Sequence, residues 1–268
     1  MFSGVKKIVT ILVVTVLLAI EFISDPGGFI EQVSEYIQSQ QQQTITTHSD
    51  VADQDSDYII SEMFASESIP EYSGTLAVVL NDNRPFFLDE PDEMYETTVS
   101  YEYYYPLDEL GRCTRAEANL GIDLMPTESR GDISNVKPSG WWNKPYDFVD
   151  GGYLYNRCHL IAFMLAGEND NEKNLITGTR YLNTAGMLPY EDMVHDYIID
   201  TNNHVLYRVS ALYEGDNLVA DGVLMEAYSV EDHGKGVQFC VVIYNVQPLV
   251  EINYLTGDNW AAGYSEGE

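Results

Sequence analysis

Residues 151–196 read GGYLYNRCHLIAFMLAGENDNEKNLITGTRYLNTAGMLPYEDMVHD. The tetrapeptide Asn-Arg-Cys-His, which begins at Asn156, ends in His159. Farther along, Asn183 follows Asn174 by nine positions and precedes Glu191 by eight. An imidazole, two carboxamides and a carboxylate at fixed steps in so short a stretch indicate a chemically active site.

Local patterns predict a strand, a loop and a helix in this stretch. Residues 153–155 predict a strand that leads into the tetrapeptide. Residues 166–173 (AGENDNEK) predict a polar loop, and 175–177 a short extended piece. Pro189 favours a helix start, so we expect a helix over 189–199. Its inward face is predicted by helical spacing to comprise Tyr190, Val194, Tyr197 and Ile198.

The stretch resembles the active site of the DNA/RNA non-specific endonucleases, the ββα-metal or His-Me finger nucleases, and most of all the secreted nucleases of Gram-positive bacteria. That family usually carries Asp-Arg-Gly-His, whose histidine is the general base. A metal-ligating asparagine follows, with another asparagine nine positions before it and a glutamate eight after it. The resemblance covers about residues 70–258 and implies an α+β fold, with an antiparallel sheet and a ββα-metal active-site motif.

The resemblance implies a role for each polar residue of the pattern. His159 is expected to be the general base, since a neutral imidazole suits proton transfer near neutral pH. Asn183 is expected to ligate Mg²⁺, with Mn²⁺ as a substitute; one carboxamide oxygen suffices because Mg²⁺ keeps most of its waters. Glu191 is expected to hold one of the waters around the cation, and Asn174 to fix the neighbouring geometry.

Three arginines are candidates for contact with phosphate. Arg157 and Arg180 carry planar guanidinium groups that match phosphate oxygens. Arg130, in the segment MPTESRG, lies where an arginine of the family often assists phosphate binding. Each of these arginines has a simpler explanation as a surface charge.

Two positions depart from the family pattern. Asn156 stands where the family usually has aspartate, so it cannot carry a negative charge. Cys158 stands where the family usually has glycine, so its side chain needs room. A lone histidine flanked by Cys158 and Leu160 is more often structural. The joint spacing is what favours catalysis for His159.

Composition bounds the function. The chain has 268 residues and a net charge of −30, the wrong sign for a general nucleic-acid binder. The charge is uneven: residues 50–110 hold sixteen acidic residues and one basic residue, whereas 111–190 hold nine acidic and eight basic residues. We therefore expect substrate binding that is weak and salt-sensitive compared with a basic nuclease.

Three cysteines, Cys113, Cys158 and Cys240, show no spacing typical of a zinc site. In an exported chain two of them can form one disulfide, and the sequence does not choose the pair. Cys158 beside His159 also permits a thiol hydrolase, although that chemistry leaves Asn174, Asn183 and Glu191 unexplained.

The chain divides into four parts. Residues 1–23 have two lysines followed by a short apolar run, which predicts a signal peptide or a membrane anchor. Residues 24–69 form a polar linker rich in Gln and Thr, 70–258 the nuclease domain, and 259–268 an acidic tail. We therefore expect a secreted or membrane-anchored protein whose catalytic domain is extracellular.

Outside the central stretch, residues 75–80, 86–88, 204–210, 218–229 and 237–246 predict strands. Residues 81–83 predict a turn, and 111–124 a short helix or a loop. Tyr103, Tyr104 and Tyr105 can stack nucleobases, but packing explains them better.

The sequence thus predicts an exported, metal-dependent, sequence-non-specific endonuclease for DNA, with RNA left open as a second substrate. By resemblance, cleavage leaves a 5′-phosphate and a 3′-hydroxyl. The alternative is a catalytically weak or inactive extracellular binding protein on the same fold, which the charge of −30 and Asn156 favour.

Overall fold

The computed structural model describes residues 69–89 and 98–263. These residues belong to one compact unit, residues 67–268. The expected export segment 1–23 and nearly all of the linker 24–69 lie outside the described residues. Within the described ranges, no helix is long and apolar enough to cross a membrane.

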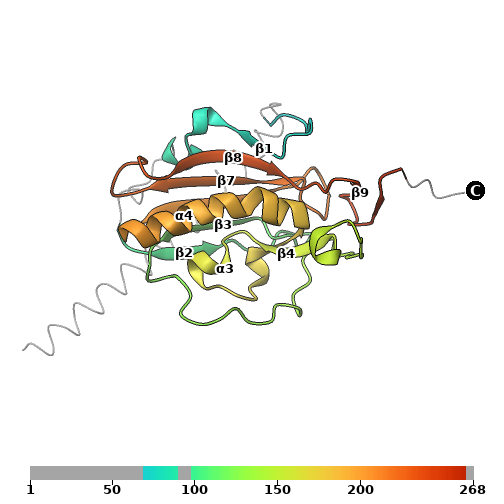
Figure 1. The fold of residues 1–268 in the computed structure, drawn as a ribbon, viewed down its shortest axis with the longest axis horizontal. Helices are drawn as coiled ribbons and strands as arrows, with labels where there is room; N and C mark the ends of the chain where they lie inside the picture. The colour runs from blue at the N-terminus through green and yellow to red at the C-terminus, as the bar shows by residue number, and fades with distance from the viewer. Residues whose placement is uncertain (1–68, 90–97, 264–268) are drawn as a thin grey trace, which may run out of the picture. The chain divides into compact units, whose positions relative to one another are not determined.

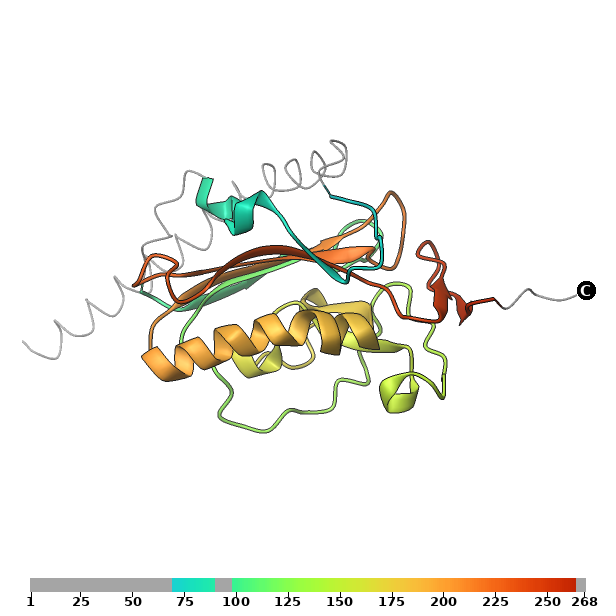
Figure 2. The same cartoon turned by 45° about the horizontal axis from the view of Figure 1, so that its top comes forward.

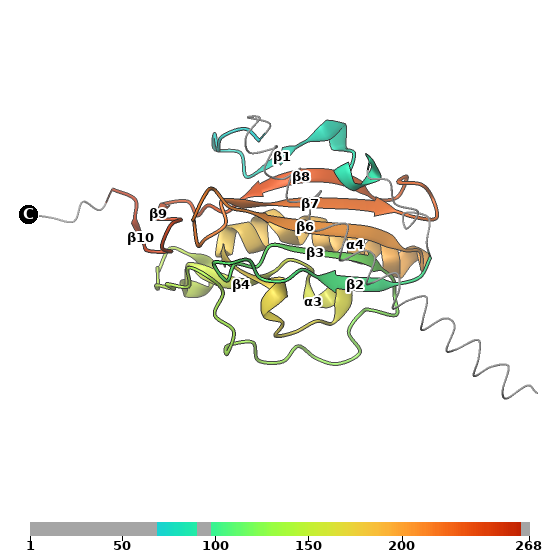
Figure 3. The same cartoon turned by 180° about the vertical axis from the view of Figure 1, so that it is seen from behind.

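Six antiparallel strands form one sheet, in the order β1-β8-β7-β6-β3-β2 (Figure 1; seen from behind in Figure 3). Each strand hydrogen-bonds antiparallel to its neighbours. The predicted antiparallel sheet is thereby confirmed. The strands are β1 (Ala77–Val79), β2 (Tyr101–Tyr104), β3 (Arg115–Leu120), β6 (Val205–Leu212), β7 (Gly222–Ser229) and β8 (Gln238–Tyr244).

One face of the sheet carries the hydrophobic core. Alternate residues of β6, from Val205 through Tyr207 to Val209, belong to the core cluster, as the two-residue period of a strand requires. The helix α4 (Leu188–Thr201) covers this face (Figure 2). The predicted inward residues of α4 do pack there: Val194 and Ile198 are fully buried, and Tyr190 and Tyr197 are partly buried.

A π-helical turn, η6 (Leu182–Met187), runs directly into α4. This turn lies very close to β8, because a Cβ added to Gly186 would be 2.5 Å from a methyl carbon of Ile243. Glycine is therefore needed at this position. Turns of π-helix are frequent at functional sites, and this one carries Asn183.

The strands β4 (Tyr155–His159) and β5 (Leu175–Thr179) form a separate antiparallel hairpin. The short helices α3 (Phe163–Ala166) and η5 (Glu172–Asn174) lie in the connection between them. The hairpin followed by η6 and α4 gives the predicted strand, strand and helix of the ββα motif.

Two expected elements are wrong. Residues 86–88 do not form a strand but belong to the 3₁₀-helix η2 (Phe86–Asp89). There the Phe86 amide donates to the Glu226 carboxylate (2.6 Å), and the Phe87 ring is buried against the sheet. Within the expected helix or loop 111–124, residues 115–120 instead form β3, an interior strand of the sheet.

The other local expectations are mostly met. Residues 81–83 form a turn, the 3₁₀-helix η1 (Asn81–Asn83), with positive φ angles. The tyrosines of β2 are half-buried and Tyr105 is buried, as packing predicts. At the C-terminal end, β10 (Asn259–Ala261) pairs with β9 (Val250–Ile252), so the first residues of the expected tail are ordered.

Candidate active site

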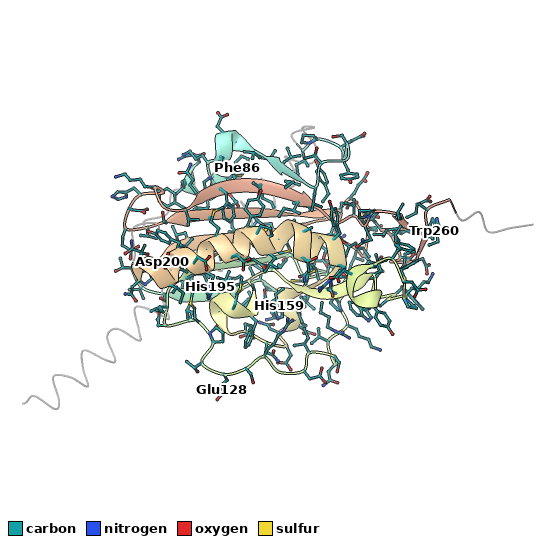
Figure 4. All side chains as sticks on the ribbon, in the orientation of Figure 1. Phe86, Glu128, His159, His195, Asp200 and Trp260 are labelled. Carbon is teal, nitrogen blue, oxygen red and sulfur yellow. The ribbon has the colours of Figure 1, made fainter. Side chains whose placement is uncertain are left out.

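His159 is the last residue of β4 and is 7% exposed. In Figure 4 it lies below α4 and above the loop that carries Glu128, whereas His195 lies on α4. The Nε2 atom of His159 is 2.8 Å from the backbone carbonyl oxygen of Asn169. A carbonyl oxygen only accepts, so Nε2 carries the proton and Nδ1 keeps a lone pair.

Burial lowers the pKa of His159 to about 4; the nearby guanidinium of Arg130 lowers it further, and the Asn169 carbonyl opposes both. The imidazole is therefore neutral at neutral pH. Its Nδ1 atom lies 3.3 Å from the Nη2 atom of Arg130. Because a guanidinium only donates, Arg130 binds the Nδ1 lone pair here, and the imidazole can accept a proton at Nδ1 only after Arg130 moves away.

Asn174 is fully buried and does not line the cavity. Its side-chain oxygen accepts from the Ile161 amide (2.8 Å), and its side-chain nitrogen donates to the Ile161 carbonyl (2.9 Å). Its own carbonyl accepts from the Leu160 amide (2.9 Å). Asn174 thus fixes the backbone that follows His159, and it has no group left for a substrate.

Asn183 and Glu191 lie on consecutive helical segments, η6 and α4, and both line the same cavity as His159. Within the described part of the chain, no hydrogen bond or ion pair reaches the Glu191 carboxylate or the Asn183 carboxamide. Burial raises the pKa of Glu191 to about 8, and the neighbouring Asp192 adds to the rise. A buried carboxylate without a partner is costly, unless a cation joins it.

A divalent cation fits these side chains. Asn183 and Glu191 offer oxygen atoms, which Mg²⁺ prefers, and both oxygen donors face a cavity of about 470 Å³. Over the ranges described, no group of three or more His, Cys, Asp or Glu side chains could hold a metal. With Asn183 and Glu191 on its wall, the cavity offers few protein oxygen atoms, which suits a cation that keeps most of its waters.

The three predicted arginines all line the cavity. Arg130 lies beside His159 on the exposed side. Arg180 donates from Nε and Nη2 to one oxygen of Asp150, at 3.0 and 2.8 Å. Because the Asp150 side chain is 79% exposed, this ion pair is weak and can be exchanged for a phosphate at little cost.

Arg157 is already engaged within the protein. Its guanidinium lies 4.3 Å from the centre of the Trp141 ring. It also donates to the carbonyl of Val136 and, at 2.8 Å, to the carbonyl of Ser134. Arg157 thus holds the loop of residues 134–136 and the Trp141 ring, and its role is to shape the wall of the cavity.

Sequence reasoning did not single out Asn169. Its carbonyl orients His159, and its side-chain oxygen accepts from the amide of Gly131 (3.1 Å), next to Arg130. A backbone carbonyl leaves no mark in the sequence. Asn156 also lines the cavity, and its buried side-chain nitrogen has no hydrogen-bond partner among the residues described.

The Cys158 side chain has room because residue 178, on the neighbouring strand, is a glycine. A Cβ added to Gly178, on the paired strand β5, would be 2.3 Å from the Cys158 sulfur atom. The thiol is fully buried and burial raises its pKa, so it is protonated and inaccessible. These properties argue against a thiol nucleophile. All three cysteines, Cys113, Cys158 and Cys240, are buried free thiols, and no disulfide forms.

Comparison with known proteins identifies relatives of this fold. The sequence model of the family described as "DNA/RNA non-specific endonuclease" matches residues 92–231. Metal-free NucA from Streptococcus agalactiae is 27% identical with a TM-score of 0.59, over 68% of this chain and 86% of NucA. Its magnesium-bound form is 26% identical with the same TM-score, over 68% and 87% of the two chains. Sda1 nuclease with bound zinc is 25% identical with a TM-score of 0.59, over 70% of this chain and 97% of Sda1. No curated protein sequence matches.

Proposed function

Because the chain belongs to the DNA/RNA non-specific endonuclease family, we propose that it is an exported, Mg²⁺-dependent endonuclease that cleaves DNA. The nuclease activity follows from the family. The metal, the site residues and the export are our proposals. The metal and the site residues rest on one observation: a neutral imidazole lines the same cavity as a carboxamide and a carboxylate that have no hydrogen-bond partner among the described residues.

His159 is the proposed general base. A water molecule beside Nδ1 would lose a proton to that atom as the water oxygen attacks phosphorus. The P–O bond to the 3′-oxygen breaks, and that oxygen takes up a proton from another water molecule. Protonation of Nδ1 gives an imidazolium, and its Nε2–H stays hydrogen-bonded to the Asn169 carbonyl. Arg130 is the proposed phosphate contact and would have to leave Nδ1 when the substrate enters.

Asn183 is the proposed direct ligand of the cation, and Glu191 would hold one of the cation's waters. When bound, the cation supplies charge neutralisation at the phosphoryl and leaving oxygens. The magnesium in one NucA structure and the zinc in Sda1 are properties of those proteins, and they support a divalent cation here. We expect products with a 5′-phosphate and a 3′-hydroxyl.

Export rests on the sequence of residues 1–23, in which Lys6 and Lys7 precede an apolar run. We propose that this segment delivers the catalytic domain to the outside of the cell, whether it is cleaved or kept as an anchor. Fractionation of producing cells, with an antibody against the domain, would locate the protein. Protein confined to the cytosol would contradict the proposal.

A plasmid-nicking assay tests the proposed activity. Supercoiled DNA should disappear in Mg²⁺ and persist in EDTA. Treatment of the native protein with iodoacetamide should leave the rate unchanged, because Cys158 is buried. Cleavage that survives EDTA and stops on alkylation would favour a thiol hydrolase. Absence of cleavage over a wide range of metals, salt and pH would favour the binding-protein alternative.

A further inference from the structure

Exposed aromatic side chains are concentrated in one segment. The exposed aromatic residues of the described ranges are Tyr72, Trp142, Phe148 and Tyr153, and three of these four lie within residues 142–153. Trp142 is 61% exposed, Tyr153 56% and Phe148 49%. Single exposed rings need no explanation, but several in one segment mark a surface that binds something. We call these three rings the aromatic rim.

The segment that carries the aromatic rim is part of the wall of the active-site cavity. Trp141 and Asn143, on either side of Trp142, line the cavity. Asn143 binds both backbone groups of Tyr155 in β4, at 2.9 and 3.0 Å. Farther along the segment, Asp150 accepts from Arg180, which also lines the cavity. The segment that carries the rim therefore also supplies part of the wall of this cavity.

The segment is also held in a fixed shape. Its two arms meet in a bridge between Pro145 and Tyr153, and the Tyr146 amide donates to the Gly152 carbonyl (3.0 Å). The Tyr146 hydroxyl donates to the side-chain oxygen of Asn259 (2.8 Å), which anchors the segment to β10. Rings on a fixed loop lose little entropy on binding a ligand, so the surface is preorganised.

The chemistry around the rim favours nucleobases as its ligand. A chain of net charge −30 gains little from long-range attraction to a polyanion. Arginines on the cavity wall can hold a phosphate backbone, and neighbouring rings can then stack on the bases. Single-strand binding sites combine these two features. In a duplex the faces of the bases are occupied by other bases, so a stacking surface favours unpaired strands.

We propose that the aromatic rim stacks unpaired nucleobases next to the scissile phosphate, so that this enzyme prefers single-stranded over duplex nucleic acid. The inference rests on the proposed function, because it assigns the cavity to the phosphate. Binding is measured first, in EDTA, so that no cleavage occurs. The probe is a fluorescent single-stranded oligonucleotide of mixed sequence, compared with its blunt duplex by anisotropy.

The wild type should bind the single strand at least tenfold more tightly than the duplex. Replacement of Trp142, Phe148 and Tyr153 together by alanine should weaken single-strand binding by about tenfold or more and change duplex binding less than threefold. The log–log slope of affinity against salt should stay the same, since no phosphate contact is removed. Tyr72→Ala, which removes an exposed ring outside the segment, is the matched control and should change neither affinity.

The inference is overturned if the triple variant still prefers the single strand as strongly as the wild type does. It is also overturned if the three substitutions weaken binding of the single strand and of the duplex by the same factor. The double variant Trp142→Phe/Tyr153→Phe keeps an aromatic ring at both positions and should retain the wild-type preference for the single strand. Its failure to do so, in a folded protein, would also overturn the inference. Cleavage of the same probes in Mg²⁺ is then measured separately. Rim-dependent selective binding without cleavage would support the stacking surface and refute the nuclease activity. Cleavage without rim-dependent selectivity would support the nuclease activity and refute the stacking surface.

Discussion

The Nε2 atom of His159 lies 2.8 Å from the carbonyl oxygen of Asn169, and this single contact decides which ring nitrogen can act as a base. The side chain of Asn169 also accepts from the Gly131 amide at 3.1 Å. One residue therefore ties the base to the loop that carries Arg130. The tautomer of His159 and the position of the loop that carries Arg130 are therefore set together.

Asn169→Ala removes the acceptor for the Gly131 amide and leaves the Asn169 carbonyl in place. We expect KM for DNA to rise about fivefold with a smaller change in kcat, because a lost hydrogen bond of about 1 kcal/mol loosens the loop of Arg130. Asn169→Asp keeps an acceptor and should stay near wild type. Steady-state kinetics on a labelled duplex provides the measurement. If Asn169→Ala raises KM by the same factor in an Arg130→Ala variant as in the wild type, the two residues do not act together.

Glu191→Gln should stabilise the cation-free protein while it removes activity. The pKa of Glu191 is raised to about 8 in the folded state, so the unfolded chain loses the proton more readily. This group contributes stability below about pH 4.5, and that contribution is lost as the pH rises toward 8, by a total on the order of 4–5 kcal/mol. Glutamine does not titrate and avoids this loss.

Urea denaturation in EDTA at pH 5 and pH 8 measures the effect of Glu191→Gln. The variant should exceed the wild type at pH 8 and match it at pH 5. Addition of Mg²⁺ should narrow the gap at pH 8, because only the carboxylate gains from the cation. A variant that is less stable at pH 8 would show that Glu191 is a structural residue with partners of its own.

With Mg²⁺ bound, which keeps the Glu191 carboxylate ionised, the acid limb of the activity profile should lie near pH 4 and not near 6.5. Burial holds the pKa of His159 at about 4, so the base stays neutral until the pH falls to that value. The unfolded chain binds its proton already near pH 6.5, so stability also falls as the pH drops from 6.5 to 4. Initial rates from pH 4 to 8 at constant ionic strength test this. An acid limb at 6.5 would mean that His159 is solvated in the active protein.

Gly178→Ala should destabilise the protein by about 1–3 kcal/mol, because the new methyl group would overlap the Cys158 sulfur. Cys158→Gly, which restores the glycine usual in the family, removes that overlap. The double variant should therefore recover much of the loss from Gly178→Ala. Thermal or urea unfolding of the four proteins in the cycle measures the coupling. Additive losses would show that the two positions do not share one space.

The sequence predicted the helices and strands whose hydrophobic residues recur at a clear period or whose ends are marked by a residue such as proline. The helix after Pro189 and the strands at 204–210 and 237–246 have such signals, and each appears within a few residues of the expected bounds. The interior strand β3 was missed because its core-facing residues include Ala116 and Ala118, which have weak strand propensity. The side chains that alternate with them, such as Arg115 and Glu117, are buried although they are charged.

The candidate site was predictable where side chains carry the chemistry. His159, Asn183 and Glu191 were proposed from the family resemblance and their spacing, and the structure places all three on the wall of one cavity. The spacing also drew attention to Asn174, whose buried carboxamide only holds the backbone. The contact of Asn169 uses a backbone carbonyl, which any residue type could supply. Such a contact depends on the fold and has no sequence signal.

The most direct test of the central claim is chemical rescue of His159→Gly. The wild type and the variant are compared for plasmid nicking in Mg²⁺, with and without added imidazole, after the variant is shown to unfold cooperatively. We expect the variant to lose activity by about 10²–10⁴-fold and to regain part of it as the concentration of neutral imidazole rises. A folded variant that cuts DNA at nearly the wild-type rate without imidazole would contradict the assignment of His159 as the general base.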